Sequence, residues 1–511
     1  MEVDNSNSKI GINGRRWVQQ RKHLLLKGLI ACGSLAALTL APLWETLLFS
    51  KYNFHHPQPG KNDYLSGLIL IAVLVSVLGF IFYCLRYLSS FNRKYAGGVL
   101  LIIFLSPALN QIRSLLGQKL IPEFVATTIW FKIFPLLLGI SFLALARSCY
   151  LILWKFILLC FPFSLLIAAK LGLGCFNKSK GELTMVPTHI GAPEKRLYNR
   201  VVWLIFDELD YRLTFPERPK QLLLPNFDRL ADQSFNFTNA VPPARATIVS
   251  VPSLIDGVTY NVAYPTAPNR LMLGSSEGGI APWGTRSNIF TDVSGMGGRC
   301  AVIGWYLPYS RIFSESVHLT HWVGFSSESF IGLGGDLYST VKMHLIGLTP
   351  IIRQILHSRN QIILEEVLRS IVANQDYNLC FIHLPAPHLP KLAQEKALTY
   401  MSDAESYFAN LKVADRILGR CVDQIRNSPC ANNTTLIVSS DHSWRASKLY
   451  DNKVDYRVPL IVHFAGQSRR TDLGPMVHTV NTRKLISEII AKDTVINSDL
   501  GENILSVKIS E

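Results

Sequence analysis

The sequence predicts an α/β fold, with a mostly parallel sheet covered by helices on both faces and an all-α membrane region before it. Two observations predict this arrangement. Long apolar stretches fill the first third of the chain, and strand-like runs alternate with helical periodicity over residues 199–511. Such alternation is typical of a parallel sheet, because each crossover between parallel strands carries a helix.

The elements of the carboxyl-terminal part follow from the period of their apolar residues. Strand-like runs lie at 199–206, 299–305, 377–383, 434–440 and 458–464. A helical period marks the segments 225–233, 351–373 and 403–426. This part of the chain is long enough for one large domain with its own core.

The first third predicts a transmembrane domain of five helices. Its apolar stretches are residues 24–49, 64–88, 95–112, 124–146 and 149–171. About 20 apolar residues suffice to cross a bilayer, so each stretch is a candidate span. The third is short and contains Pro107 and Asn110, so a re-entrant or kinked segment is the alternative for it.

The distribution of charge predicts the orientation in the membrane. Residues 1–200 hold 22 Lys and Arg against 7 Asp and Glu, and the whole chain has 51 against 36, so residues 201–511 hold 29 of each. Basic residues precede the first stretch and follow the second and the fourth, which places those segments in the cytoplasm. With five spans we expect a multi-pass protein of the cell (inner) membrane whose carboxyl-terminal half is periplasmic or extracellular. The basic excess is then a topology signal, and we expect no nucleic-acid partner.

The boundary between the two parts lies in residues 172–198, which are rich in Gly, Pro and charge and predict a linker. We therefore expect a transmembrane domain at 1–171 and a catalytic domain at 199–511. The nine cysteines form no CxxC pair, which argues against a zinc finger. Whether Cys421 and Cys430 form a local disulfide stays open.

Three strand-like runs end in residues that bind metals. VVWLIF leads into Asp207 and Glu208, NLCFI into His383, and TLIVSS into Asp441 and His442. In an open α/β sheet the ligand crevice lies outside the carboxyl ends of the strands, so these side chains are expected to converge. Taken alone, each pair is explained as a cap of a strand or helix. Together they favour a site for a divalent cation, with Zn²⁺ or Mn²⁺ suited to this mix of oxygen and imidazole donors.

A nucleophile is expected in the segment VPPARATIVSVPSLIDG. Thr247 and Ser250 both lie where a helix can begin, and a helix amino terminus favours an oxyanion or a phosphate. A hydroxyl bound to a divalent metal ionises more readily and can attack phosphorus or sulfur. The alternative is that either residue is simply a helix N-cap.

The order of these motifs resembles the alkaline phosphatase superfamily. FDE, the Thr-bearing segment, HLPAPHLP, VADRILG, SDH and RVPLIV follow one another over residues 199–490. The likeness is greatest to the membrane-anchored sulfatase-like proteins, which include phosphoethanolamine transferases and lipoteichoic acid synthases. The five-span region also looks like the membrane domain of those transferases.

The resemblance implies metal-binding roles for several residues. Glu208 matches the carboxylate that holds the metal in the transferases, and Asp207 matches the first of the paired aspartates of sulfatases. Asp441 and His442 match the downstream metal ligands. Thr247 is expected to border the metal as well.

The same register implies the catalytic residues. Thr247 lies ten residues before Gly257, the offset between nucleophile and glycine in sulfatases, which selects Thr247 over Ser250. His383 and His388 resemble the histidines that contact the phosphate or sulfate of the substrate.

The resemblance also limits the chemistry. Formylglycine sulfatases need Cys or Ser with Pro at the second and Arg at the fourth following position, whereas Thr247 is followed by Val249 and Val251. We therefore expect a metal-dependent transferase that moves a phosphoryl headgroup from a membrane phospholipid to an envelope glycan or lipid through a phosphothreonine. The alternatives are a phosphodiesterase or sulfuric-ester-type hydrolase, and a non-catalytic envelope-assembly protein.

Overall fold

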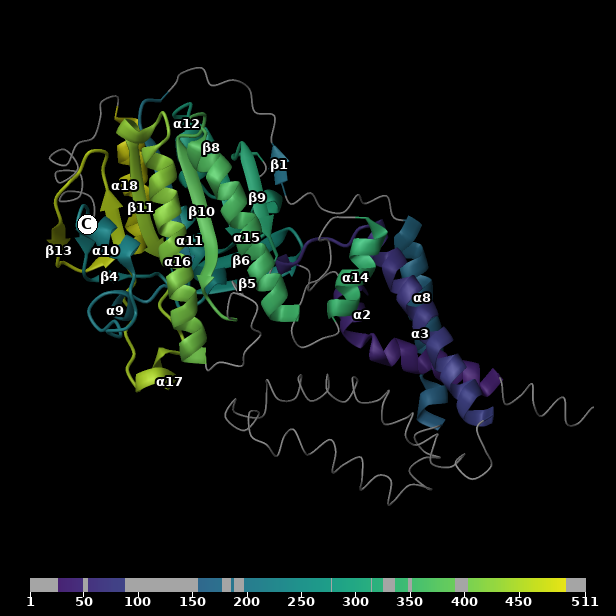
Figure 1. The fold of residues 1–511 in the computed structure, drawn as a ribbon. Helices are drawn as coiled ribbons and strands as arrows, with labels where there is room; N and C mark the ends of the chain where they lie inside the picture. The colour runs from purple at the N-terminus through teal and green to yellow at the C-terminus, as the bar shows by residue number, and fades with distance from the viewer. Residues whose placement is uncertain are drawn as a thin grey trace, which may run out of the picture. The chain divides into compact units, whose positions relative to one another are not determined.

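The computed structural model describes residues 26–48, 54–87, 155–176, 185–187, 197–276, 278–313, 315–324, 336–347, 352–390 and 403–492 (Figure 1). The chain divides into two compact units. The first takes its described residues from Met1–Phe49, Pro59–Gly181 and Leu333–Leu348. The second takes them from Ser50–Gln58, Glu182–Gly332 and Thr349–Glu511.

The first unit is helical. Its described helices are Leu26–Thr39, α2 (Ala41–Leu48), α3 (Lys61–Tyr87), α8 (Phe161–Phe176) and α14 (Leu337–Gly347). Helix α3 packs against both α8 and α14. Large apolar side chains are exposed on α3 and α8, including Phe80 and Leu173, which are 69% and 71% exposed. A lipid environment would cover such surfaces, and water would not.

The described residues do not show the predicted five spans. Two helices are long and apolar enough to cross a membrane, Lys61–Ile81 and Lys155–Phe176, and two such helices are weak evidence of membrane association. The stretch 24–49 is broken by a turn at Leu40 into two shorter helices. The stretches 95–112 and 124–146 lie outside the described residues.

Helix α14 joins the first unit although it lies far along the sequence. His344 on α14 is fully buried, with its Nδ1 2.9 Å from Ser66 Oγ and its Nε2 3.3 Å from a carboxylate oxygen of Asp63. These polar contacts connect α14 to the amino-terminal end of α3. Sequence periodicity gave no sign of this return, because the contact joins residues almost three hundred positions apart.

The second unit is built on a nine-stranded mixed sheet in the order β1-β9-β8-β10-β2-β11-β12-β3-β13. The strands are β1 (Met185–Pro187), β2 (Arg200–Asp207), β3 (Phe235–Phe237), β8 (Cys300–Trp305), β9 (Leu319–Val323), β10 (Leu379–Pro387), β11 (Thr434–Ser440), β12 (Leu460–His463) and β13 (Thr471–Leu473). The five central strands from β9 to β11 run parallel, whereas β12 is antiparallel to both β11 and β3. Strand β1, in the expected linker, pairs antiparallel with β9.

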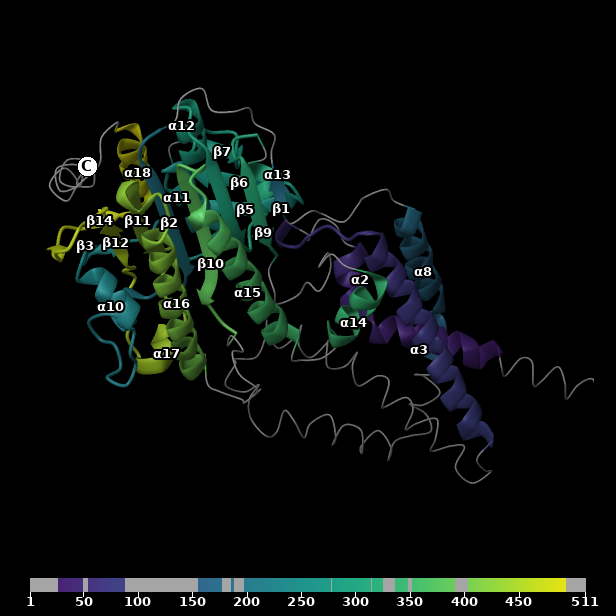
Figure 2. The same cartoon turned by 45° about the horizontal axis from the view of Figure 1, so that its top comes forward.

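Helices cover both faces of this sheet (Figure 2). One layer contains α10 (Pro225–Ala231), α15 (Ile352–Ala373) and α16 (Asp403–Arg426), and the other contains α11 (Thr247–Asp256), α12 (Ile289–Gly295) and α18 (Thr482–Ala491). Smaller elements complete the unit: β4 (Ala240–Val241), β5 (Val262–Ala267), β6 (Arg270–Ser275), β7 (Gly279–Pro282), β14 (Val477–His478), α9 (Tyr211–Thr214), α13 (Tyr309–Ile312), α17 (Ser447–Asp451), η2 (Ala431–Asn433) and η3 (Thr479–Asn481).

The central strand β2 shows how the sequence supports two cores. Its eight residues are all buried, and successive side chains of a strand point to opposite faces. Trp203 and Ile205 pack with α11, α12 and α18, whereas Leu204 and Phe206 pack with α10, α15 and α16. A continuous apolar run is therefore required, because both faces of β2 are covered.

The predicted strands and helices of this unit are confirmed in place and type. Each of the five strand-like runs overlaps one strand of the sheet, and α10, α15 and α16 coincide with the three helical segments to within two residues. The largest differences are the extension of β10 to Pro387 and the reversed direction of β12. Direction cannot be read from an apolar run, because parallel and antiparallel buried strands share the same pattern.

Candidate active site

The alternation of side chains along three neighbouring strands brings the candidate ligands together. Phe381 of β10 and Ile437 of β11 belong to the same core as Ile205 of β2, on the α11 face. With a period of two, Asp207, His383 and Asp441 all follow on that face. In register, His383 pairs with Ile205, and Asp441 directly follows Ser440, which pairs with Phe206.

Asp207, His383 and Asp441 form a compact buried cluster. One ligand atom of each lies within 4.8 Å of the others, and all three residues are 0% exposed. The His383 Nε2 atom is 3.7 Å from Asp207 Oδ2. Among the described residues, this is the group of three that has the geometry to hold a metal ion.

The donor atoms of the cluster fit a divalent cation. Asp207 Oδ1, Asp441 Oδ2 and His383 Nε2 are buried and make no hydrogen bond. A buried polar atom without a partner is costly, and two adjacent carboxylates repel each other. A divalent cation bound by these three atoms would remove both costs, and oxygen and imidazole donors suit Zn²⁺ or Mn²⁺.

Helix α11 places the candidate nucleophile beside the cluster. Thr247 is its first residue, and its Oγ1 donates a hydrogen bond of 3.2 Å to Asp207 Oδ2 and lies 3.3 Å from His442 Nε2. Ser250, the other candidate, is fully buried and donates to the carbonyl of Asp441. The helix ends at Gly257, which has a φ of 63°, so the ten-residue spacing is the length of α11 followed by a left-handed cap.

Glu208 is held in an uncommon backbone conformation at the end of β2. Its φ is 64°, its N–H donates to Asp441 Oδ1 at 3.2 Å, and its carbonyl accepts from the Tyr407 hydroxyl at 2.8 Å. A non-glycine residue with positive φ is strained and is often found at functional sites. The turn therefore fixes the direction in which the Glu208 carboxylate leaves the strand.

The carboxylate of Glu208 is bound by an arginine. Arg445 Nε donates to Glu208 Oε1 at 2.6 Å, and an Arg445 amino group is 3.3 Å from His388 Nε2. The Arg445 side chain is 48% exposed, whereas the Glu208 side chain is 6% exposed. The site thus has a buried anionic part and a solvent-facing cationic edge.

The protonation states of the buried groups follow from their neighbours. Burial would raise the pKa of Asp207, but the His388, His383 and His442 rings outweigh burial and hold this pKa below its usual range. Burial and the adjacent Asp207 charge raise the pKa of Asp441. Burial would lower the pKa of His442, but the nearby Asp441, Asp207 and Glu208 carboxylates outweigh burial and raise this pKa above its usual value.

Sequence reasoning missed the residues that support this cluster. The buried Tyr309 hydroxyl lies 3.0 Å from His383 Nδ1, and Tyr407 stacks on Trp444 with ring centroids 4.2 Å apart. Trp444 is 2% exposed and packs in the core on the α15 and α16 face. Its large ring therefore lies away from the Asp207, His383 and Asp441 cluster, which is on the α11 face. No local signal marks Tyr309, because it lies on a four-residue helix 74 positions before its histidine.

The predicted residues fall into two groups. Asp207, Thr247, His383, Asp441 and His442 surround one buried point, with Thr247 3.3 Å from His442. His388 and Glu208 are linked to each other through Arg445 at the exposed edge. Their chemical roles stay a prediction. Cys421 and Cys430 are both buried with free thiols.

Comparisons with known proteins place this unit in a family. The sulfatase family model matches residues 200–498, which is more than half of the chain. A phosphoglycerol transferase I of Xanthomonas campestris pv. campestris is 25% identical over 292 residues, covering 52% of this chain and 37% of that protein. A phosphoglycerol transferase I of Xanthomonas euvesicatoria pv. vesicatoria is 24% identical over the same length. The chain therefore spans little more than a third of the length of these relatives.

The chain is also similar to solved structures that are more distant in sequence. A phosphonate monoester hydrolase of Agrobacterium radiobacter is 13% identical with a TM-score of 0.41, covering 57% of this chain and 73% of that one. An alkaline phosphatase superfamily protein of Vibrio parahaemolyticus is 15% identical with a TM-score of 0.39, covering 60% of this chain and 69% of that one. The match of the family model over most of the second unit decides the assignment: the chain belongs to the sulfatase family.

Proposed function

We propose that this protein is a metal-dependent transferase that moves a phosphoryl headgroup, of the phosphoethanolamine or phosphoglycerol type, from a membrane phospholipid to an envelope glycan or lipid. The observation that carries the proposal is the position of the Thr247 hydroxyl. It lies 3.2 Å from Asp207 and 3.3 Å from His442, beside three buried ligand atoms that make no hydrogen bond.

Asp207, His383 and Asp441 would hold the cation, with Thr247 and His442 at its border. A bound divalent cation lowers the pKa of an adjacent hydroxyl and neutralises charge that develops on a phosphoryl oxygen. Thr247 Oγ1 is already oriented by its hydrogen bond to Asp207, so its lone pairs are directed away from that carboxylate. This orientation favours attack on a phosphorus atom placed at the mouth of the site.

The reaction balances in two halves. In the first, Thr247 Oγ1 loses its proton and forms a bond to phosphorus, while the bond from phosphorus to the diacylglycerol oxygen breaks and that oxygen takes up a proton. In the second, the oxygen of an acceptor hydroxyl loses its proton and forms a bond to phosphorus, while the bond from phosphorus to Thr247 Oγ1 breaks and Oγ1 takes up a proton. His388 lies at the exposed edge, where a proton can pass to the leaving oxygen.

Arg445 is suited to bind the phosphate of the donor. Its guanidinium is half exposed and bordered by Glu208 and His388. An arginine held by a carboxylate at one nitrogen keeps other N–H groups for a phosphate. Glu208, which we expected among the metal ligands, has one carboxylate oxygen bound to Arg445, so only its other oxygen would remain for a cation while this bond holds. The variant Glu208→Gln therefore distinguishes a role of Glu208 as a metal ligand from a role in orienting the Arg445 guanidinium.

The two apolar helices and the curated relatives support a donor in the lipid phase, with the second unit on the periplasmic or extracellular side. The second candidate is a phosphodiesterase or other ester hydrolase, in which water resolves the intermediate. A non-catalytic envelope-assembly role is disfavoured, because the candidate nucleophile Thr247 lies next to the buried cluster of candidate metal ligands.

The test uses the full chain, purified in detergent with Zn²⁺ or Mn²⁺ and radiolabelled phospholipid. We expect release of diacylglycerol that is slow alone and rises when a glycan or lipid acceptor is added. Thr247→Ala should abolish release, whereas Ser250→Ala serves as the matched control. Rapid hydrolysis of soluble phosphodiesters without an acceptor would favour the hydrolase. Release of diacylglycerol by Thr247→Ala would reject both the transferase and the hydrolase, since both use Thr247 as the nucleophile.

A further inference from the structure

The segment that begins at Arg445 exposes most of its large side chains. We call residues 445–457, with the sequence RASKLYDNKVDYR, the rim segment; it contains α17. Its four large apolar or aromatic side chains are all exposed: Leu449 at 78%, Tyr450 at 41%, Val454 at 44% and Tyr456 at 48%. A single exposed apolar side chain needs no explanation, but a group of four in one short segment indicates an interaction surface.

Both ends of the rim segment border the entrance to the candidate active site. At its start, Arg445 Nε donates to Glu208 Oε1 at 2.6 Å. Near its other end, the Arg245 guanidinium lies over the ring of Tyr456, 4.5 Å from the centroid, and donates to the Tyr456 hydroxyl at 3.3 Å. Arg245 precedes Thr247 by two residues. The exposed side chains therefore lie between two contacts with the site.

The acidic side chains of the rim segment are turned toward arginines. The segment has four basic and two acidic residues, which leaves a net charge of +2. Asp455 is bound by Arg457, with 2.7 Å between the amino nitrogen and the carboxylate oxygen, and the Asp455 side chain is 14% exposed. Asp451 accepts from Arg212 at 3.2 Å, and the Arg212 side chain is 4% exposed. Both negative charges are thus neutralised locally.

Basic side chains are exposed beside the apolar ones. Lys448 and Arg245 are both exposed. Lys453 is 60% exposed, and its Nζ lies 2.8 Å from Glu217 Oε2 in a surface pair, which contributes little. Apolar and aromatic side chains bordered by cations suit an anionic lipid surface, because the apolar groups enter the interface while the cations contact the headgroups.

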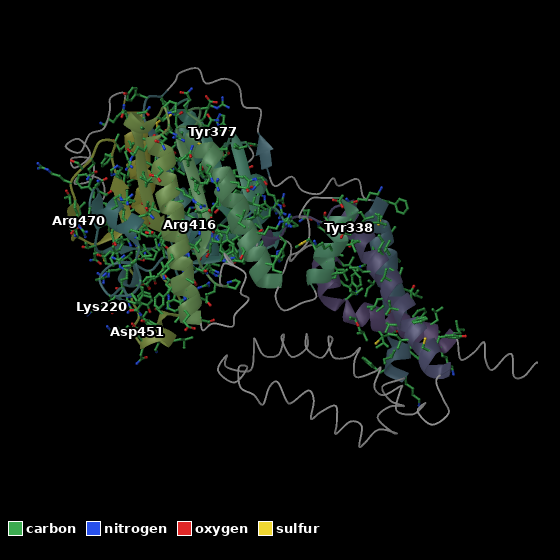
Figure 3. The ribbon with its side chains drawn as sticks, in the orientation of Figure 1. Lys220, Tyr338, Tyr377, Arg416, Asp451 and Arg470 are labelled. Atoms are coloured by element: carbon green, nitrogen blue, oxygen red, sulfur yellow. The ribbon has the colours of Figure 1, made fainter. Side chains whose placement is uncertain are left out.

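The rim segment is held in place by the second unit. The Tyr450 ring packs against Phe408 of α16 with centroids 5.0 Å apart. Arg457 donates to the carbonyl of Thr238 at 3.1 Å and lies over the ring of Tyr211, 4.9 Å from its centroid. Figure 3 shows Asp451 of α17 at the end of this unit opposite Tyr377. Because the shape of the surface exists before any contact, binding needs little ordering of the chain.

We propose that the rim segment docks on the surface of a bilayer that contains anionic phospholipids. Its apolar and aromatic side chains enter the headgroup region, and its basic side chains contact lipid phosphates. Docking would open the entrance of the active site at the membrane surface, where the headgroup of a donor lipid lies. This consequence rests on the proposed function, whereas the docking itself rests on the exposed side chains.

The test uses the full-length chain in nanodiscs of phosphatidylcholine, part of which carries a photoactivatable diazirine in its acyl chain. A second set of nanodiscs also contains phosphatidylserine, which supplies negative charge without being a donor of either proposed type. After illumination, lipid adducts are mapped by mass spectrometry. We expect adducts to be enriched on residues 445–457 over the peptide that contains the exposed Gln375, near Tyr377. Their yield should rise with phosphatidylserine and fall at high salt.

Two variants of exposed residues make the assignment specific. Leu449→Ser removes an apolar side chain, and Lys448→Glu reverses a charge. In nanodiscs with phosphatidylserine, Lys448→Glu should lower the adduct yield at least about fivefold, the factor that one basic residue contributes near an anionic surface. The matched controls are Ile280→Ser on β7, where Ile280 is 58% exposed, and Lys484→Glu on α18, where Lys484 is exposed. Both controls should leave the adducts unchanged.

The outcomes separate docking from the reaction. Thr247→Ala should retain the adducts, because docking needs no turnover. Adducts that persist while no headgroup is ever found on Thr247 would support docking and reject the proposed function alone. Equal adducts at both ends of the unit, or an unchanged yield in both Lys448→Glu and Leu449→Ser, would overturn the proposal. Absence of adducts from the rim segment would overturn it too, and nanodiscs that then hold two copies of the chain would assign this surface to self-association.

Discussion

Tyr309→Phe tests whether His383 is a metal ligand or only a buried histidine. The Tyr309 hydroxyl lies 3.0 Å from His383 Nδ1, and both side chains are fully buried. If the imidazole donates its Nδ1–H to this hydroxyl, the tautomer is fixed and the Nε2 lone pair faces Asp207 and Asp441. The substitution keeps the ring and its contacts with Trp283 and Phe381, whose ring centroids lie 6.2 and 5.8 Å away.

The expected loss follows from the outer hydrogen bond. Removing such a partner of a metal-bound histidine costs about 10-fold to 100-fold in metal affinity, which is about 1.4 to 2.7 kcal/mol. The assay is competition for Zn²⁺ or Mn²⁺ between the purified protein and a chelator, with the melting temperature of the metal-free protein as a control for folding. Tyr377→Phe is the matched control far from the site. An affinity within twofold of the unchanged protein would refute the reasoning.

Three further predictions concern the surroundings of the site. Trp444→Ala should destabilise the fold by about 3 to 5 kcal/mol in chemical denaturation, because it removes a buried ring stacked on Tyr407; a loss below 1 kcal/mol would show that the stack contributes little. Gly257→Ala should lower stability by at least about 1 to 2 kcal/mol, since φ is 63° and the new Cβ would lie 2.8 Å from Arg483 Cδ; an unchanged melting temperature would contradict this. Metal affinity should fall as the pH is lowered, because protons compete with the metal for the carboxylates. Burial and the Asp207 charge raise the pKa of Asp441, so this competition begins at a higher pH than for an ordinary aspartate. A metal affinity that does not change with pH would show that these carboxylates do not bind the metal.

The convergence of Asp207, His383 and Asp441 could be predicted from the sequence because it depends on local rules. Continuous apolar runs identify buried strands, and a period of two decides the face to which the next residue points. The expectation that His383 binds substrate phosphate was less direct, because it came from a resemblance. The structure places its Nε2 in the candidate metal cluster instead.

The rest of the site depends on contacts that no local pattern encodes. Arg445 reaches Glu208 because the chain turns after Trp444 enters the core, and this path is set by tertiary packing. The same holds for α14, which returns to the first unit through His344. Apolar length alone also gives no sign of the turn at Leu40 within the stretch 24–49.

The central claim is that Thr247 carries the phosphoryl headgroup during turnover. It is tested most directly by mass spectrometry of the full-length protein, quenched with acid after incubation with metal and phospholipid in the absence of an acceptor. The account predicts one added phospho-headgroup on the peptide that contains Thr247, at the threonine itself, and its disappearance when an acceptor is supplied. Turnover with an unmodified Thr247, or a label on Ser250 in its place, would contradict it.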